Sequence, residues 1–529
     1  MDDETLDPPK PAHSPEVRGS RYSRVDPRSS HRELKLKGPT FRDLRKGTSR
    51  METSRGTLEL LSLENDPPDI LFESAPVSGE PIWPHLRMPI ANAMAATELQ
   101  AEGVVVEGHH SPVRTALRYL RAFGPERRLP RTRVAQRLCF LVGGGTIAET
   151  QGRGENWLVD DFARTEPDSV VIQRKPLTLS PSFERTFSLQ NAFARIDLTH
   201  KLRPLAPPPE HLIRGAVDAV AARVAIHIDP DTARSIVRSV SYDLARIGRI
   251  NNLLKQVFDR LDPSMVLIED ASYGSYAGAI RQLRERGVAV IEPQHGWIGP
   301  SHAAYNFGVL MRSEHLERAL PDTLLTFGDF WSAGVRFPGE TVSIGKPHMD
   351  RMSTSVGNYR DRRRAVLVAS SVSEPQKMAA LVRSLRLALP RDWEIVFRTH
   401  PSERSTQERR YPQLVGLDGV VFDDQDDVYE SMRNVRAVIG VASTVLYEAL
   451  AMRCHVFAFD SPFARYYLDP VFGEPISDDE GLMRAVDTLT SDAPPPISDL
   501  DLDRFWKRDA VGNFARFVAE RQPAIEIRS

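Results

Sequence analysis

Two polar segments in the second half of the chain carry side chains suited to binding a phosphate. The first is 398–403, Arg-Thr-His-Pro-Ser-Glu, and the second is 441–448, Val-Ala-Ser-Thr-Val-Leu-Tyr-Glu. His400 can donate a hydrogen bond from a ring nitrogen, and Ser443 and Thr444 add two hydroxyls. The same serine and threonine begin a predicted helix, whose free N–H groups attract anions. The combination predicts a phosphate-binding site.

Four more side chains extend this predicted site. Arg398 adds a positive charge, and Ser370 and Ser371 follow another apolar run from which they could reach a diphosphate. Glu448 lies four residues after Thr444 on the same helix face, where a carboxylate could accept hydrogen bonds from a ribose diol. The alternative interpretation is structural: the serines only cap helices, and the histidine and the glutamate are solvated.

Short apolar runs that end abruptly in polar residues position these segments. Such runs, at 265–268, 288–291, 394–397 and 437–441, have the composition of buried strands. Predicted helices lie between them, and strands that alternate with helices indicate a parallel, doubly wound sheet. Open α/β sheets bind ligands at the carboxyl ends of their strands. We therefore predict an α/β fold in which the polar residues line a crevice.

The donor-side motifs resemble those of a group of bacterial enzymes. Arg-Thr-His-Pro at 398–401, followed by Ser-Thr at 443–444 and a helix that carries Glu448, is similar to the donor half of GT-B glycosyltransferases and glycerophosphotransferases of surface polysaccharides. Bacterial sialyltransferases, polysialyltransferases and CDP-glycerol glycerophosphotransferases share an HP motif and a serine/threonine pair that hold the nucleotide's phosphates. The resemblance covers roughly residues 260 to 460. It implies two facing doubly wound domains of the GT-B type and a nucleotide-activated donor, CMP or CDP first and UDP or GDP as alternatives.

The resemblance also implies a catalytic base. In these families a histidine beside a glycine in the acceptor-side domain faces the donor, and Gln294-His295-Gly296, with His302 after it, is similar to that motif. An acceptor hydroxyl attacks poorly unless its proton is removed as the bond forms. His295 is the first choice for this role and Asp270, which follows the preceding strand, is the second. The alternative is a buried histidine that steadies a turn.

Two further loops are candidate ligand-binding segments. Gly144 lies in Gly-Gly-Gly-Thr at 143–146, after an apolar run, and glycines let the backbone approach a substrate closely. A turn that only packs is an equal alternative. The acidic run 423–427 suggests a metal, but it continues into a predicted helix at 428–434, whose N-terminus suits acids. We expect no metal and no cofactor apart from the nucleotide-activated substrate.

Composition narrows the class of protein. The chain has 529 residues, of which 41% are hydrophobic, enough for two domains. A net charge of −2 gives no case for nucleic acid as a partner. No apolar run is long enough to span a membrane, and the N-terminus lacks the plan of a signal peptide, so we expect a cytoplasmic protein.

The expected domain organisation has four parts. They are a disordered tail at 1–66, an acceptor-side domain at 67–320, a donor-binding domain at 321–490 and a closing helix at 491–529. Basic residues outnumber acidic ones between Arg18 and Arg55. The tail could therefore contact the inner face of the membrane, where a lipid-linked acceptor would lie.

These features predict a metal-independent transferase that moves a sugar or a glycerol phosphate from a nucleotide-activated donor to a hydroxyl of a surface glycan or lipid-linked acceptor. One rival is a sugar-nucleotide 2-epimerase or hydrolase with the same two-domain plan. The sequence argues against it because we recognise no carboxylate-rich set for removing a proton from a sugar carbon. Another rival is a non-catalytic glycan- or nucleotide-binding protein of a polysaccharide assembly complex.

Overall fold

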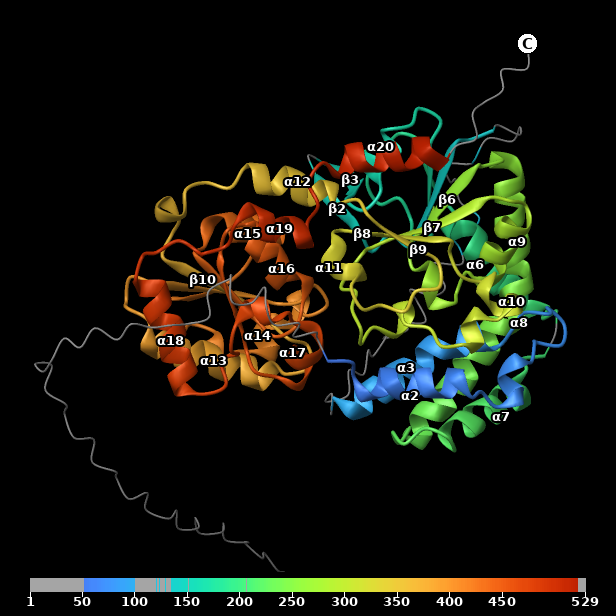
Figure 1. The fold of residues 1–529 in the computed structure, drawn as a ribbon, viewed down its shortest axis with the longest axis horizontal. Helices are drawn as coiled ribbons and strands as arrows, with labels where there is room; N and C mark the ends of the chain where they lie inside the picture. The colour runs from blue at the N-terminus through green and yellow to red at the C-terminus, as the bar shows by residue number, and fades with distance from the viewer. Residues whose placement is uncertain are drawn as a thin grey trace, which may run out of the picture. The chain divides into compact units, whose positions relative to one another are not determined.

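The computed structural model describes residues 52–99, 120, 123, 129, 135–150, 152–205 and 207–521. Residues 1–51, which make up most of the expected basic tail, lie outside the described residues. The described part contains two parallel sheets and a separate antiparallel hairpin, β2 (Ile147–Thr150) with β3 (Arg153–Asn156) (Figure 1). The predicted α/β class with parallel sheets is confirmed.

The first sheet has seven parallel strands in the order β5-β4-β1-β6-β7-β8-β9. They are β1 (Leu138–Val142), β4 (Val170–Gln173), β5 (Thr186–Ser188), β6 (Met265–Ile268), β7 (Ala289–Pro293), β8 (Thr323–Thr326) and β9 (Glu340–Ser343). Phe140 of β1 pairs with Val171 on one side and Leu267 on the other. Every residue of β1, β4 and β6 is buried, as expected for parallel strands covered on both faces. The strand order reverses between β1 and β6.

Helices cover both faces of this sheet. Phe193, Leu254 and Ile280, from α6, α8 and α9, belong to the apolar cluster on one face. The helices of this part of the chain are α2 (Arg55–Asn65), α3 (Trp83–Glu98), α5 (Asp160–Ala163), α6 (Gln190–Leu202), α7 (Glu210–Ala221), α8 (Pro230–Leu261), α9 (Ala277–Glu285), α10 (Glu314–Glu317) and α11 (Asp329–Ser332). Asp229 caps the start of α8 by accepting the N–H of Thr232 at 2.9 Å. α8 is 32 residues long and buries one apolar face, which includes Ile236, Leu244 and Leu254.

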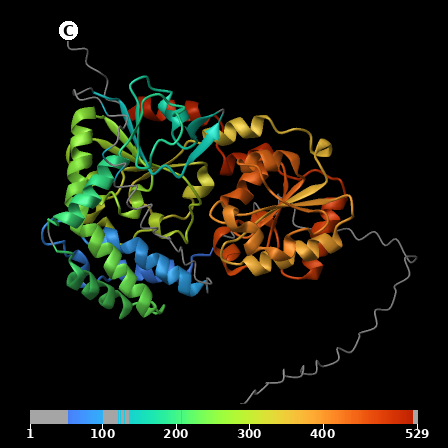
Figure 2. The ribbon, with the colours of Figure 1, turned by 180° about the vertical axis from the view of Figure 1, so that it is seen from behind.

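The second sheet has five parallel strands in the order β12-β11-β10-β13-β14. They are β10 (Ala365–Ala369), β11 (Glu394–Arg398), β12 (Val420–Phe422), β13 (Ala437–Gly440) and β14 (His455–Ala458). Its helices are α12 (Pro347–Thr354), α13 (Pro375–Ala388), α14 (Gln407–Arg410), α15 (Val428–Asn434), α16 (Thr444–Ala451), α17 (Pro462–Tyr467) and α18 (Asp479–Thr490). Side chains of α13 and α18 share one apolar cluster with β10, β11 and β13, and Figure 2 shows helices flanking these strands. The strand order reverses between β10 and β13.

The C-terminal segment differs from the single closing helix expected from the sequence. It forms two helices, α19 (Asp499–Phe505) and α20 (Ala510–Arg521), separated by a turn in which Asp509 has a φ of 62°. α20 packs on the first sheet: Phe514 stacks on Phe162 of α5 with ring centroids 4.4 Å apart. The chain thus returns to the first sheet after completing the second.

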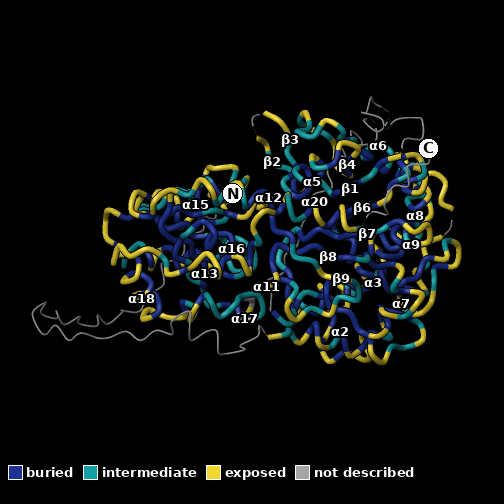
Figure 3. The backbone as a smooth tube through the Cα atoms, turned by 45° about the horizontal axis from the view of Figure 1, so that its top comes forward, coloured by how far each residue is buried: buried dark blue, intermediate teal, exposed yellow. Residues whose placement is uncertain are grey.

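Two expected boundaries also change. β8 and β9 pair with the first sheet, so this sheet extends to Ser343 and the boundary expected at residue 321 is too early. The tail expected at 1–66 is too long, because α2 begins at Arg55 and is capped by Ser54. Both errors arise where the partner of a segment is far away in the sequence. In Figure 3 the inner strands β1, β6 and β8 of the first sheet run through the buried part of the backbone, whereas the edge strand β9 is exposed or half-buried.

No helix among the described residues is both long enough and apolar enough to cross a membrane.

Candidate functional site

A cavity lies at the carboxyl ends of β10, β11 and β13, where the order of the second sheet reverses. Its volume is about 430 Å³. Sheets of this kind bind ligands at such a reversal point. Its lining includes five of the residues predicted from the sequence to bind phosphate: Ser370, Ser371, Arg398, His400 and Ser443.

The backbone around His400 is held by two neighbouring side chains. The His400 N–H donates to Ser370 Oγ at 2.9 Å and to Glu403 Oε2 at 3.2 Å. The Ser402 N–H donates to His400 Nδ1 at 3.3 Å, and the Ser402 hydroxyl lies 2.8 Å from the same nitrogen. Because Nδ1 accepts, the neutral ring carries its hydrogen on Nε2. His400 is exposed, so Nε2 can donate to a ligand.

Glu403 organises this loop, although sequence reasoning assigned it no role. Its buried carboxylate accepts hydrogen bonds from Ser370 Oγ at 2.7 Å and Tyr411 Oη at 3.0 Å, and it forms an ion pair with Arg410. A buried carboxylate with this many donors is fixed in place. The sequence feature that could have pointed to Glu403 is its position three residues after His400, within the predicted phosphate-binding segment.

Ser443 caps α16, and its Oγ accepts the N–H of Val445 at 3.2 Å. Its hydroxyl hydrogen remains available to donate towards the cavity. Thr444 begins the helix beside it, but its side chain is not part of the cavity lining. The structure therefore brings Ser443 and His400 to the same cavity and leaves Thr444 at its margin.

The side chain of Arg398 binds the acidic loop at 423–426. Its guanidinium forms an ion pair with the buried Asp423 and donates to the carbonyls of Gln425 and Asp426 at 2.9 and 3.0 Å. Asp427 caps α15, as the sequence predicted for this acidic run. Within the described residues, no group of three or more His, Cys, Asp or Glu side chains could hold a metal ion. Metal independence stays a prediction.

Glu448 does not reach the cavity. Its buried carboxylate accepts a hydrogen bond from Lys346 Nζ at 2.7 Å, and Lys346 also donates to Tyr429 Oη at 2.9 Å. The ammonium group lies 4.5 Å from the ring centroid of Trp157 and 5.7 Å from that of Trp506. Because Glu448 is buried against this cation and does not line the cavity, the structure does not support the ribose-binding role expected for it.

The two candidate bases contact each other at the carboxyl ends of β6 and β7. His295 Nε2 lies 3.0 Å from Asp270 Oδ1. Asp270 is the more accessible member, with 44% of its side chain exposed against 20% for His295. The other ring nitrogen, Nδ1, is buried and has no hydrogen-bond partner among the described residues. With Nε2 directed at Asp270, the accessible basic atoms of the pair are the carboxylate oxygens.

Two more carboxylates lie beside this pair. Glu269 accepts the N–H of Gly143 at 2.6 Å, and burial raises the pKa of Glu269 although this hydrogen bond acts in the opposite direction. Burial raises the pKa of Glu292 to about 8, while hydrogen bonds from Ser272 and Tyr305 oppose the shift. The sequence argument against an epimerase stated that the chain has no carboxylate-rich set, and this statement is wrong. Glu269 and Asp270 follow β6 and Glu292 lies in β7, so only the folded sheet gathers them.

The remaining predicted cleft residues mostly serve the backbone. His302 is buried, which lowers its pKa to about 3; Nδ1 accepts the Ala304 N–H at 3.3 Å, and Nε2 lies 3.2 Å from Tyr273 Oη. Gln294 accepts from the Phe327 N–H at 2.7 Å and donates to the carbonyl of Gly296 at 2.8 Å. These two side chains fix the loop that carries His295, and the cleft role expected for Gln294, Gly296 and His302 stays a prediction.

Gly144 has a φ of 89°, in the left-handed region that favours glycine. A Cβ there would approach the Lys175 side chain to 3.0 Å, so the loop is packed closely. The neighbouring Gly143 N–H is taken by Glu269. The loop thus binds a carboxylate of its own chain, and a substrate role for Gly144 stays a prediction.

Trp297 joins the loop of His295 to the cavity wall. Its indole Nε1 donates to the carbonyl of Tyr467 at 2.9 Å, and the two rings lie 4.3 Å apart between centroids. Tyr467 lines the 430 Å³ cavity. Sequence reasoning missed Trp297, whose only signal was its place two residues after His295.

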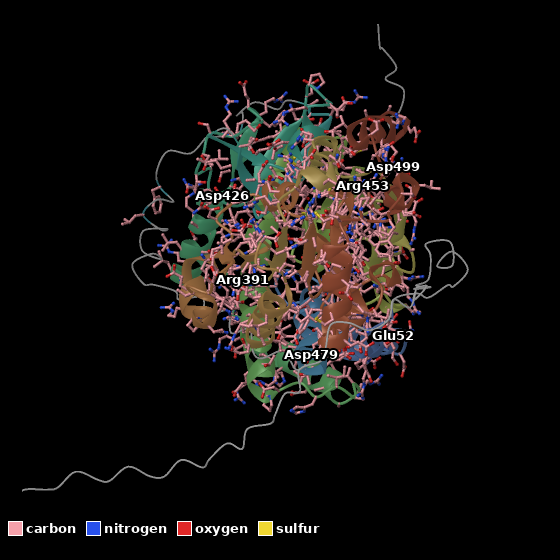
Figure 4. All side chains as sticks on the ribbon, turned by 90° about the vertical axis from the view of Figure 1, so that its left-hand side faces the viewer. Glu52, Arg391, Asp426, Arg453, Asp479 and Asp499 are labelled. Atoms are coloured by element: carbon pink, nitrogen blue, oxygen red, sulfur yellow. The ribbon has the colours of Figure 1, made fainter. Side chains whose placement is uncertain are left out.

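The larger cavity, of about 620 Å³, lies between α12, α16, α19 and α20 and away from the strand ends. Charged side chains of its lining form ion pairs with one another. Arg453 pairs with Asp499, and the two lie together in Figure 4; Arg351 pairs with Asp161.

Comparisons with known proteins place this chain in no named family. No family model matches it, and no curated protein matches it. Among solved structures, the UDP-N-acetylglucosamine 2-epimerase of Rickettsia bellii is 12% identical, with 73% of this chain and 96% of that chain covered and a TM-score of 0.40. The UDP-GlcNAc 2-epimerase of Methanocaldococcus jannaschii, in complex with UDP-GlcNAc and UDP, is 11% identical over 73% of this chain and 99% of that chain, with a TM-score of 0.41.

A glycosyltransferase also appears among the similar structures. The pneumococcal O-GlcNAc transferase GtfA, in complex with UDP and GlcNAc, is 11% identical over 52% of this chain and 60% of that chain, with a TM-score of 0.36. Similarity at this level carries no argument about the activity of the chain, which has to be inferred from the geometry of its own residues.

Proposed function

We propose that this protein transfers a sugar or a glycerol phosphate from a nucleotide-activated donor to a hydroxyl of a surface glycan acceptor, without a metal. The observation that carries the proposal is the cavity at the carboxyl ends of β10, β11 and β13, where His400 and Ser443 come together at the start of α16. A set of hydrogen-bond donors of this kind suits a phosphate, and the motif's resemblance to GT-B transferases supports the same class of donor.

His400 and Ser443 would act on the leaving nucleotide. As the bond to the transferred group breaks, negative charge grows on the phosphate oxygens. The Nε2 hydrogen of His400 and the hydroxyl of Ser443 are preplaced to stabilise this charge, and the dipole at the start of α16 acts in the same direction. Because Glu403 and Ser370 fix the loop, little reorganisation is needed in the transition state.

The Asp270–His295 pair would remove the proton of the acceptor hydroxyl. The acceptor oxygen forms the new bond, the bond to the nucleotide phosphate breaks, and the proton passes to the exposed carboxylate of Asp270. His295 then holds this carboxylate in place through the 3.0 Å contact. This assignment reverses the order expected from the sequence, since the remaining nitrogen of His295 is buried.

A second candidate function is epimerisation or hydrolysis of a sugar nucleotide. The specific observation that favours it is the set of carboxylates, Glu269, Asp270 and Glu292, on adjacent strands beside His295. A carboxyl whose pKa is raised to about 8 can hold a proton at neutral pH, which is what proton exchange at a sugar carbon requires.

A release assay separates these functions. Purified protein is incubated in D₂O with CMP-, CDP-, UDP- and GDP-activated donors, with and without a bacterial glycan extract, and nucleotide release and deuterium incorporation are followed by mass spectrometry. Release that requires the extract is the result expected for a transferase. Release without any acceptor indicates a hydrolase, and deuterium in the sugar indicates an epimerase. Neither release nor exchange with any donor would contradict both enzymatic proposals and favour a binding protein.

A further inference from the structure

Trp297 is in direct contact with both halves of the candidate site. It follows His295 by two residues, in a loop that Gln294 anchors at one end through the Phe327 N–H. Its ring stacks on His302, with centroids 5.9 Å apart and planes 22° apart. Its Nε1 donates to the Tyr467 carbonyl at the wall of the nucleotide cavity. Among the described residues, no other side-chain hydrogen bond joins the 294–299 loop to the cavity lining.

The Tyr467 carbonyl is a shared acceptor. It takes the Trp297 indole N–H at 2.9 Å and the Tyr447 hydroxyl, also at 2.9 Å. Tyr447 lies in α16, the helix whose first turn begins at Ser443 beside the cavity. A phosphate bound at the start of α16 would therefore act on a helix that is hydrogen-bonded to the same carbonyl as Trp297.

We propose that Trp297 couples occupancy of the nucleotide cavity to the position of the Asp270–His295 pair. A nucleotide that orders α16 and Tyr467 orders Trp297 through the shared carbonyl, and Trp297 in turn fixes the loop that carries His295. Trp297 is thus a positioning residue that touches neither the donor phosphate nor the acceptor. This inference rests on the proposed nucleotide site.

The coupling can be measured by intrinsic fluorescence. The chain has six tryptophans, and Trp297 is the one hydrogen-bonded to the cavity wall, so CMP, CDP or UDP bound there should change the emission of the wild-type protein. Trp297→Phe keeps an aromatic ring but removes the N–H. We expect this variant to lose the emission change while the nucleotide still raises its Tm.

Trp393→Phe is the matched control. Trp393 is buried in the core of the second sheet and immediately precedes β11, at the opposite end of the strand from the cavity. This variant should keep both the emission change and the Tm shift. If Trp297→Phe also keeps the emission change, the coupling is refuted.

Hydrogen exchange of the wild-type protein gives a readout that does not depend on the variant folding. Addition of the same nucleotide should slow exchange of the amides in the 294–299 segment. Unchanged exchange there, in protein whose Tm the nucleotide raises, would refute the coupling and leave the nucleotide site intact. If no nucleotide raises the wild-type Tm, the proposed function itself fails, and the coupling fails with it.

Discussion

His295 Nε2 lies 3.0 Å from Oδ1 of Asp270, so two residues that the sequence offers as competing bases form a single pair. The left-handed backbone of Asp270, with a φ of 59°, turns its carboxylate towards the histidine of the adjacent strand end. The pair has one accessible end, the carboxylate, and one buried end, Nδ1.

We expect Asp270→Asn to lower the transfer rate by about 10² to 10⁴, because it removes the accessible base. Asparagine tolerates a left-handed backbone, so the turn is preserved. His295→Ala should cost less, about tenfold, because the carboxylate remains but is no longer held. Initial rates are the measurement. Asp262→Asn, at another aspartate with positive φ, is the control and should retain full activity. A larger loss for His295→Ala than for Asp270→Asn would assign the base to the histidine.

Glu292 should make stability fall as the pH rises. Burial raises the pKa of this carboxyl to about 8, from 4.5 in a model compound, so between these values the folded protein holds a proton that the unfolded chain releases. Its contribution is therefore complete below pH 4.5 and is lost as the pH approaches 8. Glu292→Gln removes this titration, and its stability relative to wild type should rise with pH by at most about 1.4 kcal/mol per unit. Urea unfolding of both proteins between pH 5 and 8 tests this; parallel curves would show that Glu292 is ionised in the fold.

Glu403→Gln should disturb the phosphate loop. The substitution places an amide N–H₂ among donors, the Tyr411 hydroxyl and the His400 N–H, and should destabilise the fold by about 1 to 3 kcal/mol. Nucleotide affinity should fall as well, because His400 is no longer held. Isothermal titration calorimetry measures the affinity. The control, Glu408→Gln at an exposed glutamate of α14, should change neither the stability nor the affinity. An unaltered nucleotide affinity in Glu403→Gln would show that Glu403 does not position His400 for binding.

Lys346 and Glu448 should behave as one buried unit. Lys346→Met leaves the Glu448 carboxylate buried without its cation, which should cost about 3 to 5 kcal/mol of unfolding free energy. The double variant Lys346→Met with Glu448→Gln should recover part of this loss, because no isolated charge remains. Denaturant unfolding of the two single variants and the double variant gives the coupling energy. Strictly additive losses would mean that the pair makes no net interaction.

The strand ends could be predicted from the sequence because their signal is local. The apolar run before His400 and the helix start at Ser443 both follow from neighbouring residues, and parallel strands bring their carboxyl ends to one edge. The grouping of Ser370, His400 and Ser443 around one cavity follows from the same rule.

Long-range partners could not be predicted in this way. Helix periodicity places Glu448 one turn after Thr444 but gives no sign of Lys346, which lies 102 residues away and takes its carboxylate. Likewise, the sequence presents Glu292 as an ordinary acid at the end of a strand. Its hydrogen bonds from Ser272 and Tyr305 form only in the folded protein. The assignment of β8 and β9 to the first sheet has the same cause, since strand pairing is a tertiary contact.

The central claim, a nucleotide site at the carboxyl ends of β10, β11 and β13, is tested most directly by thermal unfolding with CMP, CDP, UDP, GDP and TDP. A nucleotide at a hundred times its Kd should stabilise the wild-type fold by about 2.7 kcal/mol. His400→Ala should lose this shift without a lower starting Tm, since the side chain is exposed, and His211→Ala, at an exposed histidine of α7, should retain it. No shift with any nucleotide, or an equal shift in His400→Ala, would contradict the account.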